Sequence, residues 1–428
     1  MILSASPVWH PFTQHGLGEP IPQVERAEGA LLHCADGSTL IDGISSWWVI
    51  THGHCDPRIV AAMQAQAGTL DQVIFAGYTH APAEEVARGL IRLTDAALPS
   101  GDPLRHVFFS DSGSTAVEVG LKMALGYWHN IGAPRHKIVV MEHSYHGDTI
   151  GAMSVGARGV FNRAYAPLLF DVETIPFPEG DGRNTLDALE ALCARSDKPA
   201  ALIAEPLILG AGGMLVYGAD VLRGMADICA AQDVLFIADE VMTGWGRTGT
   251  LFACENAGIT PDILCTAKGL TGGSIPLAAT LSTARIFEAH CSDDRARMFF
   301  HSSSFTANPI TCAAAAANIA IWEGDDVRGR IAGLSAYMAE RLAGLATHPA
   351  LENPRLLGAI AAIDLKTGGA AGYMSDVAPA LRAFFLERGL LLRPLGNAIY
   401  VMPPYCTSAP QLDAIFDAIG EAASQFGA

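Results

Sequence analysis

The stretch Val234-Leu-Phe-Ile-Ala-Asp239-Glu240 decides the fold class. It is a short apolar run with β-branched and aromatic side chains that ends abruptly in two acids, which is typical of a strand buried on both faces of a parallel sheet. Ligands of open α/β sheets bind beyond the carboxyl ends of such strands. We therefore expect Asp239 to lie at a ligand-binding edge.

Similar apolar runs recur along the chain and alternate with sequence of helical character. They cover residues 106–109, 137–141, 201–204, 263–265 and 277–280. Short strands that alternate with helices predict an α/β protein built on a mostly parallel sheet. We expect residues 56–322 to form a large domain and residues 323–428 to form a smaller α+β domain. Residues 1–55 are expected to belong to the smaller domain. The glycine-rich residues 367–373 are predicted to form a mobile loop.

The composition narrows the possible partners and compartments. The chain has 428 residues, 50% of them hydrophobic, so it can bury a large core. Its 27 basic and 44 acidic residues give a net charge of −17, which argues against a nucleic acid or an anionic membrane as a partner. Nine cysteines without a Cys-x-x-Cys pair favour the reducing cytoplasm. Neither a signal pattern nor an apolar run of about 18 residues is present, so we expect no export and no membrane span.

The segment His52-Gly-His54-Cys55 places two imidazoles and a thiol close together. Metals bind such groups, but the segment has no second ligand pair at a recognisable spacing. Gly53 and Pro57 instead indicate a loop that leads into a helix. We expect no metal site.

Lys268 stands among small, non-ionisable neighbours in Asp262-Ile-Leu-Cys-Thr-Ala-Lys-Gly269. Most lone lysines are solvated surface charges. The strand that ends in Asp239 changes this interpretation, because pyridoxal phosphate needs an amine that holds it as a Schiff base and an acid that keeps its ring nitrogen protonated. Lys268 and Asp239 supply both groups, which predicts a site for this cofactor.

The turn Asp111-Ser-Gly-Ser-Thr115 follows the first predicted strand of the sheet. Thr115 and Glu118 have the spacing of a capping box, which predicts a helix start at this turn. Backbone N–H groups at a helix start bind phosphate, and glycine lets the anion approach closely. A plain helix cap explains the same residues. After a buried strand we favour phosphate, bound by Gly113 and Ser114.

The segment Gly244-Trp-Gly-Arg-Thr-Gly249 matches the dinucleotide-binding pattern GxGxxG literally. That pattern joins a strand directly to a helix and is followed by an acid about 20 residues later. Here three residues, 241–243, separate the glycines from the strand, and residue 269 is glycine. We interpret the segment as an active-site loop that presents Arg247, which either contacts a substrate or braces the loop.

Two further segments offer aromatic rings. Tyr145, in Ser144-Tyr-His-Gly-Asp148, follows a predicted strand and can stack on a planar cofactor, although a tyrosine packed in a loop fits equally well. Trp47 and Trp48 are adjacent, so in an extended segment they point to opposite faces and only one lines a common pocket. Two tryptophans packed in a core are the alternative.

Together these motifs resemble the class III, fold-type I, pyridoxal-phosphate aminotransferases, and the resemblance extends over nearly the whole chain. It is carried by Asp111-Ser-Gly-Ser114, Tyr145-His-Gly-Asp148, Ala238-Asp-Glu240, Gly244 to Gly249 and Ala267-Lys-Gly269. Within the family the chain is most similar to the members that aminate 8-amino-7-oxononanoate in biotin biosynthesis. The narrower similarity rests on Trp9 to Thr13, Asp42 to Trp48, His80-Ala-Pro82, Tyr145 to Ser154, Gly210 to Met214, Arg393-Pro394 and Met402 to Tyr405.

The resemblance implies a fold and a set of roles. The large domain is expected to hold a mostly parallel seven-stranded sheet. Lys268 is expected to hold the cofactor, Asp239 to pair with its ring nitrogen, and Tyr145 to lie against the ring, while Gly113 and Ser114 bind the phosphate. The residues expected to contact substrate are Phe12, Trp47, Tyr145, Asp148, Arg247, Lys268, Ser302 and Arg393. Among them, Arg393 grips the substrate carboxylate bidentately and Trp47 lines the pocket for its alkyl chain.

Members of this family are homodimers with active sites at the interface, where a loop from the partner contributes to phosphate binding. Ser303 and Ser304 occupy the place of that loop. Many relatives that use S-adenosylmethionine have Gly-Pro-Thr at the positions of residues 302–304 and Tyr at the position of Phe12. Ser304 keeps the hydroxyl of Thr. Phe12 lacks a hydroxyl and resembles relatives that use lysine, so S-adenosylmethionine is the expected donor and lysine the open alternative.

The expected reaction is a ping-pong transamination in which Lys268 moves the proton and 8-amino-7-oxononanoate becomes 7,8-diaminononanoate. The rival enzyme hypothesis is another class III reaction, such as ω-amino acid:pyruvate transamination. The rival from another class is a protein that binds the cofactor without catalysis. The intact Lys268 and Asp239 argue against this last hypothesis.

Overall fold

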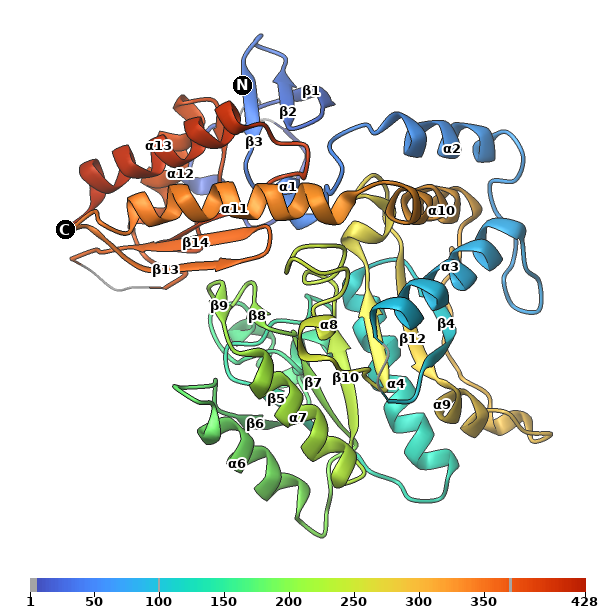
Figure 1. Ribbon diagram of the computed structural model, residues 1–428. Coiled ribbons are helices and arrows are strands. Elements are labelled where there is room, and N and C mark those ends of the chain that lie inside the picture. Colours follow the sequence, from blue (N-terminus) through green and yellow to red (C-terminus); the bar gives the residue numbers. More distant parts are fainter. Residues whose placement is uncertain (1–5, 99–100, 369–371) are drawn as a thin grey trace.

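The computed structural model describes residues 6–98, 101–368 and 372–428. Residues 369–371, within the predicted mobile loop, lie outside the described residues. Figure 1 shows two parts: a large one around a central sheet, and a smaller one at the upper left in which both ends of the chain lie.

A seven-stranded sheet forms the centre of the large part. Its strands, in spatial order, are β4 (Leu104–Ser110), β12 (Ala278–Thr283), β11 (Ile263–Thr266), β10 (Leu235–Asp239), β7 (Ala201–Ala204), β5 (Ile138–Met141) and β6 (Glu173–Ile175). The five strands from β11 to β6 run parallel, whereas β12 is antiparallel to both β11 and β4. The expected mostly parallel seven-stranded sheet is confirmed. Apolar runs predict six of these strands, and β6 lacks the signal because only one of its three residues is buried.

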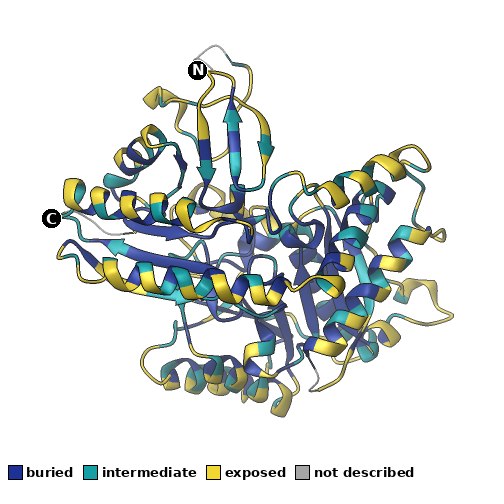
Figure 2. Cartoon of the chain, turned by 45° about the horizontal axis from the view of Figure 1, so that its top comes forward, coloured by how far each residue is buried: buried dark blue, intermediate teal, exposed yellow. Residues whose placement is uncertain are grey.

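Helices cover both faces of this sheet. One layer contains α4 (Gly113–Asn130), α5 (Ile150–Ser154) and α9 (Ala284–Ala289). The other contains α3 (Ala81–Ala97), α6 (Arg183–Cys193), α7 (Ala219–Ala231), α8 (Cys254–Ala257) and α10 (Pro309–Gly324). In β10, Ile237 packs on the first layer and its neighbours Phe236 and Ala238 on the second. Successive strand residues therefore face opposite apolar layers, which is why these strands are apolar without alternation. Figure 2 shows the strands buried between helices whose outer faces are exposed.

The two ends of the chain build the smaller part together. One sheet contains β1 (Val24–Glu28), β2 (Leu31–Cys34), β3 (Thr39–Asp42) and, parallel to β3, β15 (Leu390–Leu391). An antiparallel sheet of β13 (Leu351–Leu357), β14 (Ile360–Leu365) and β16 (Ala398–Val401) shares a core with α11 (Val327–Leu345), α12 (Val377–Glu387) and α13 (Ala409–Phe426). The domain boundaries near residues 55 and 322 stay a prediction.

Short elements connect the two parts. They are α1 (Ser45–Trp48), α2 (Pro57–Ala67) and the hairpin of β8 (Ile208–Leu209) and β9 (Leu215–Val216). In α1, the Trp48 indole donates a hydrogen bond to the Tyr400 hydroxyl (2.9 Å), and Ser45 Oγ donates to the Met402 carbonyl (2.8 Å). These bonds fasten the N-terminal region to the C-terminal one.

The two imidazoles considered as metal ligands have separate partners. His54 Nε2 lies 2.8 Å from Asp42 Oδ2, and His52 Nε2 lies 2.9 Å from Asn318 Oδ1. Over the described residues, no group of three potential ligands comes together. In the same part of the chain, no helix has both the length and the apolar character needed to cross a bilayer.

Candidate active site

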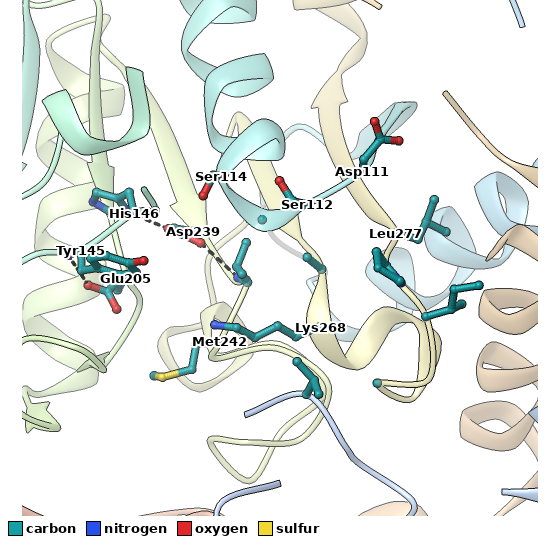
Figure 3. Close-up of a pocket in the computed structure, with 18 of the residues that line it drawn as sticks. Asp111, Ser112, Ser114, Tyr145, His146, Glu205, Asp239, Met242, Lys268 and Leu277 are labelled. Carbon is teal, nitrogen blue, oxygen red and sulfur yellow. Dashed lines mark hydrogen bonds and ion pairs between the residues drawn. The ribbon is translucent and has the colours of Figure 1, made fainter. Parts of the chain in front are cut away.

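A cavity of about 430 Å³ opens at the carboxyl ends of the parallel strands (Figure 3). We call it the inner cavity. Its lining includes Asp111, Ser112, Gly113, Ser114, Tyr145, His146, Glu205, Asp239 and Lys268. Asp239 ends β10, Glu205 directly follows β7, and Lys268 begins a turn shortly after β11. The sheet thus gathers three ionisable groups that are far apart in sequence, as expected for the strand ends of an α/β fold.

Lys268 stands in a left-handed backbone conformation with φ +46°. Such a conformation is rare for a residue with a side chain, and it persists mainly at functional sites. Its Nζ lies 4.9 Å from the centre of the Trp48 ring. Burial lowers the pKa of Lys268 to about 8, although the charges of Asp239 and Glu205 partly oppose this shift. More of these amines are therefore uncharged near neutral pH than in an exposed lysine, and the uncharged amine is the form that attacks a carbonyl carbon.

Asp239 is held through both carboxylate oxygens. Oδ1 accepts a hydrogen bond from the Val241 amide (3.1 Å), and Oδ2 accepts one from His146 Nδ1 (2.7 Å). Both Asp239 and His146 are buried, and His146 Nε2 has no hydrogen-bond partner among the described residues. The sequence interpretation assigned no role to His146. Its position next to Tyr145 in the same motif was the available signal.

Glu205 is a second acid of the inner cavity that the sequence interpretation missed. It accepts hydrogen bonds from the Tyr145 amide (2.9 Å) and the Gly210 amide (3.0 Å). Burial raises the pKa of Glu205 to about 7, with His146 lowering it and Asp239 raising it further. Since Glu205 directly follows β7 and Asp239 ends β10, the same strand-end signal was present in the sequence.

The helix that starts at the inner cavity begins earlier than its predicted capping box. Ser112 is the N-cap: its Oγ accepts from the Thr115 amide (3.3 Å), and Thr115 Oγ1 accepts from the Ser112 amide (2.9 Å). The predicted pairing of Thr115 with Glu118 is wrong, because the backbone is already helical from Gly113 and Glu118 instead accepts from the Gly151 amide (3.1 Å). Gly113 and Ser114 are thus the first two helical residues, whose N–H groups have no partner within a helix.

Ser114 packs against a tight turn at Gly147, two residues after Tyr145. The Asp148 amide donates to Ser114 Oγ (3.2 Å). A Cβ on Gly147 would collide with Ser114, and φ at Gly147 is +131°, so this position requires glycine. Burial, followed by the Asp148 carboxylate, raises the pKa of Tyr145, and its hydroxyl therefore stays protonated.

A second cavity, of about 380 Å³, adjoins the inner cavity, and Val49, Tyr145 and Lys268 line both. We call it the aromatic cavity. Its other lining residues include Phe12, Trp47, Trp48, Asp148, Phe161, Tyr373, Arg393 and Tyr400. The guanidinium of Arg393 lies 5.5 Å from the centre of the Trp47 ring and donates to the Phe12 carbonyl (2.7 Å). Aromatic walls and a cation give this cavity the chemistry to bind an alkyl chain that carries a carboxylate.

Both tryptophans line the aromatic cavity, so the expectation that only one would do so is wrong. The segment is not extended. It forms the short, distorted helix α1, in which Ser46 has φ +58° and ψ −92° and Trp47 has φ −124° and ψ +60°. Trp48 is buried against Tyr400, whereas Trp47 is 41% exposed and touches the Phe12 ring edge-on, with centroids 5.6 Å apart.

Arg247 lines neither cavity. Its buried guanidinium donates to the carbonyls of Ile50 (2.7 Å) and Pro403 (3.1 Å) and lies 5.1 Å from the centre of the Tyr405 ring. Of the two roles considered, the geometry supports bracing rather than contact with a substrate. The arginine ties a loop of the large part to both ends of the chain.

The serines at 302–304 also lie outside both cavities of their own chain. Ser302 and Ser304 are exposed, and Ser303 Oγ donates to Asp111, which lines the inner cavity. Phe300 and Phe305 flank them and are 62% and 61% exposed. Exposed aromatic side chains beside a cavity are typical of a subunit interface. The contribution of these serines to a partner's site stays a prediction.

The groups that line the inner cavity fit pyridoxal phosphate. The cavity presents a partly uncharged lysine amine, a buried carboxylate oriented by His146, and the start of the 18-residue helix α4. An amine, an acid and a helix N-terminus match the aldehyde, the ring nitrogen and the phosphate of the cofactor. The volume also lies within the range of small-molecule sites.

Comparisons with known proteins agree with this geometry. The model of the family described as aminotransferase class III matches residues 13–423. An adenosylmethionine-8-amino-7-oxononanoate aminotransferase from Synechococcus elongatus is 46% identical over 97% of each chain. A protein of the same name from Geobacter sulfurreducens is 37% identical, over 96% of this chain and 94% of the relative.

Solved structures show the same similarity. The adenosylmethionine-8-amino-7-oxononanoate aminotransferase of Methanocaldococcus jannaschii has a TM-score of 0.92 at 32% identity and covers 98% of this chain and 97% of its own. An amine transaminase from an uncultivated Pseudomonas species, in a PLP-bound form, has a TM-score of 0.91 at 30% identity over 99% of each chain.

Proposed function

Because the chain belongs to the class III aminotransferases, we propose that it transfers an amino group to 8-amino-7-oxononanoate and so forms 7,8-diaminononanoate in biotin biosynthesis. The relatives from Synechococcus elongatus and Geobacter sulfurreducens, which are named for this substrate, align over nearly their whole length. The cofactor is pyridoxal phosphate, in keeping with the family and with the groups in the inner cavity.

The observation that carries the proposal is the shape of the aromatic cavity. Lys268 and Tyr145 form its boundary with the inner cavity, and Arg393 provides a guanidinium beside the aromatic rings of Phe12 and Trp47. The acceptor has a reacting ketone near one end of an alkyl chain and a carboxylate at the other. Arg393 can grip that carboxylate bidentately while the rings pack along the chain.

We assign the cofactor-binding roles to the inner cavity. Lys268 holds the cofactor through Nζ, Asp239 faces the ring nitrogen, Gly113 and Ser114 receive the phosphate, and Tyr145 lies against the ring. When bound, pyridoxal phosphate supplies a protonated ring that withdraws electrons from the reacting carbon. His146 and the Val241 amide fix the Asp239 carboxylate in one orientation, which keeps its charge where the ring nitrogen needs it.

Lys268 also moves the proton in this proposal. Its Nζ would accept the proton from the donor carbon that bears the amine, and in the second half of the reaction it would return a proton to the reacting carbon of the acceptor. The lowered pKa of Lys268 suits this role, because an amine must be uncharged to accept a proton. The buried Trp48 ring beside Lys268 Nζ limits the access of water to these transfers.

We further propose S-adenosylmethionine as the amino donor, since the similar proteins are named for it. Lysine is the competing donor because Phe12 lacks a hydroxyl. We also propose a cytoplasmic homodimer in which Ser303 and Ser304 of one protomer approach the phosphate in the other. The exposed Phe300 and Phe305 beside these serines support the interface, and the nine unpaired cysteines support a reducing compartment.

The test is to incubate the purified protein and pyridoxal phosphate with 8-amino-7-oxononanoate and either S-adenosylmethionine or lysine, and to detect 7,8-diaminononanoate by mass spectrometry. We expect product with S-adenosylmethionine and none with the Lys268→Ala variant. A parallel incubation with β-alanine and pyruvate tests the ω-amino acid alternative. Absence of diaminononanoate with both donors, together with alanine formed from pyruvate, would overturn the proposal. Light scattering separately tests the dimer.

A further inference from the structure

We propose that a third cavity, beside Arg393, binds the nucleoside end of S-adenosylmethionine. This inference rests on the function proposed above. The cavity has a volume of about 330 Å³, and we call it the outer cavity. Its own lining residues include Leu17, Glu19, Ser375, Asp376, Ala378 and Arg382.

The outer cavity adjoins the aromatic cavity. The two share four lining residues: Phe12, Tyr373, Arg393 and Pro394. Arg393 therefore stands at the boundary, where one hydrogen bond to the Phe12 carbonyl holds its Nη2. A ligand longer than the aromatic cavity can pass this boundary and continue into the outer cavity.

The two substrates differ in where their bulk lies. In 8-amino-7-oxononanoate the carboxylate ends the molecule, so nothing extends beyond Arg393 once the carboxylate is bound there. In S-adenosylmethionine the reacting amine and the carboxylate share one carbon, and the sulfonium, ribose and adenine extend away from it. The donor thus needs space beyond the acceptor's length, and the outer cavity provides it.

The walls of the outer cavity have groups that recognise a nucleoside. Phe12 and Tyr373 offer aromatic rings on which an adenine can stack. The exposed Asp376 begins α12, yet its side chain makes no capping hydrogen bond, so its carboxylate is available to accept from ribose hydroxyls. The ion pair between Glu19 and Arg382 joins the N-terminal segment to α12 and fixes the cavity wall.

Lysine has no nucleoside and makes no use of this space. Donor choice then depends on the outer cavity as well as on the missing hydroxyl of Phe12. An enzyme that uses only lysine would leave the polar wall formed by Asp376 and Ser375 without a ligand.

The test fills the outer cavity and leaves the aromatic cavity unchanged. Ala378→Phe places a ring in the outer cavity, and Ala380→Phe, on an exposed position of the same helix, is the matched control. We expect Ala378→Phe to raise KM for S-adenosylmethionine at least about tenfold and to leave KM for 8-amino-7-oxononanoate within about twofold. Ala380→Phe should change neither.

A second variant and a binding measurement guard against a folding defect. Asp376→Ala should raise KM for S-adenosylmethionine by about threefold to tenfold, through the loss of hydrogen bonds to ribose. Titration calorimetry with 5′-methylthioadenosine, which has the nucleoside but lacks the reacting α-amino group and the carboxylate, should show binding to the wild type and to Ala380→Phe. Binding to Ala378→Phe should be at least about tenfold weaker.

The possible outcomes separate this inference from the proposed function. If diaminononanoate forms from S-adenosylmethionine while Ala378→Phe, Asp376→Ala and the wild type share the same KM for it, the outer cavity is not the nucleoside site and the function stands. Diaminononanoate formed from lysine alone also overturns the inference. If no donor gives diaminononanoate but 5′-methylthioadenosine still binds as expected, only the proposed function fails.

Discussion

The inner cavity and the aromatic cavity meet at Lys268 and Tyr145 but are built differently. The inner cavity stands on strand ends of one buried sheet, and its acids are fixed by hydrogen bonds from His146 and from backbone amides. The aromatic cavity combines segments near both ends of the chain with residues of the large part, and Phe12 and Trp47 in its wall are 42% and 41% exposed.

This difference separates two kinds of function. A site that moves protons needs charged groups with fixed geometry, which the sheet supplies. A site that selects a substrate needs a complementary shape and one or two charged contacts. Partly exposed aromatic side chains can adjust their positions to the substrate. Substitutions in the inner cavity should therefore abolish turnover, whereas those in the aromatic cavity should change KM or donor preference.

Lys268→Ala is expected to have the largest effect, and it tests whether the inner cavity carries the chemistry. We expect turnover to fall by at least about 10⁴-fold, because the variant loses both the cofactor linkage and the base. The absorbance of the covalently held cofactor should also disappear, while the circular dichroism spectrum stays unchanged. Turnover above a hundredth of the wild-type rate would show that Lys268 does not carry the chemistry.

Asp239→Asn tests the second fixed charge. Opposite charges about 4 Å apart interact by about 4 kcal/mol at an effective dielectric constant near 20. Loss of that interaction corresponds to roughly a thousandfold decrease in kcat, with little change in KM for the acceptor. Single-turnover absorbance measurements would locate the loss in the proton-transfer step. A kcat within tenfold of the wild type would contradict the assigned role.

Arg393→Lys moves the test to the aromatic cavity. Lysine keeps the charge but cannot form the bidentate contact, so we expect KM for 8-amino-7-oxononanoate to rise about 10- to 100-fold with kcat nearly unchanged. Arg247→Lys is the control: it should lower thermal stability, because the bonds to the Ile50 and Pro403 carbonyls weaken, and leave KM unchanged. Equal effects of both variants on KM would contradict the separation of roles.

The pH dependence of cofactor binding tests whether the pKa of Lys268 in the inner cavity is lowered. Only the uncharged Lys268 attacks the cofactor's aldehyde, and the pKa of this residue is lowered to about 8. Capture by the cofactor-free protein should accelerate as the pH rises through about 8 and level off above about 9. An exposed lysine, with a pKa near 10.4, would still accelerate there. Stopped-flow absorbance from pH 6 to 10 distinguishes the two profiles.

The smallest effect is expected for Phe12→Tyr. The ring already packs edge-on against Trp47 and Phe161, so the added hydroxyl changes polarity rather than packing. We expect the ratio of kcat/KM for S-adenosylmethionine to that for lysine to increase by about threefold to tenfold. Trp47→Phe provides a comparison that changes the same wall without adding a hydroxyl. Unchanged kinetics with both donors would refute a role for position 12 in donor choice.

The parts of the site that the sequence predicted are those with a local signal. Asp239 and Lys268 could be identified because one ends a short apolar strand and the other closely follows one, and Gly113 and Ser114 because they start a helix. Glu205 had the same signal after β7, so its omission was avoidable. The correct N-cap of α4 was harder to find, since Ser112 and Thr115 both suit that position and only the backbone angles distinguish them.

The remaining features depend on contacts between distant residues. His146 pairs with Asp239 across 93 positions, and Arg393 donates to Phe12 across 381. Hydrophobic periodicity predicts which residues are buried but not which buried side chains meet. For the same reason, the sequence alone does not decide between the two roles of Arg247. In the structure, its guanidinium donates hydrogen bonds to two backbone carbonyls.

The joining of the two chain ends sets an order of events during synthesis. Ser45 and Trp48 leave the ribosome early, but their partners Met402 and Tyr400 are among the last residues made. The central sheet, with Asp239 and Lys268, is complete well before then. A nascent chain can therefore form the inner cavity while the aromatic cavity still lacks a wall, and a messenger truncated before Arg393 would encode a protein with the reactive lysine but without its substrate pocket.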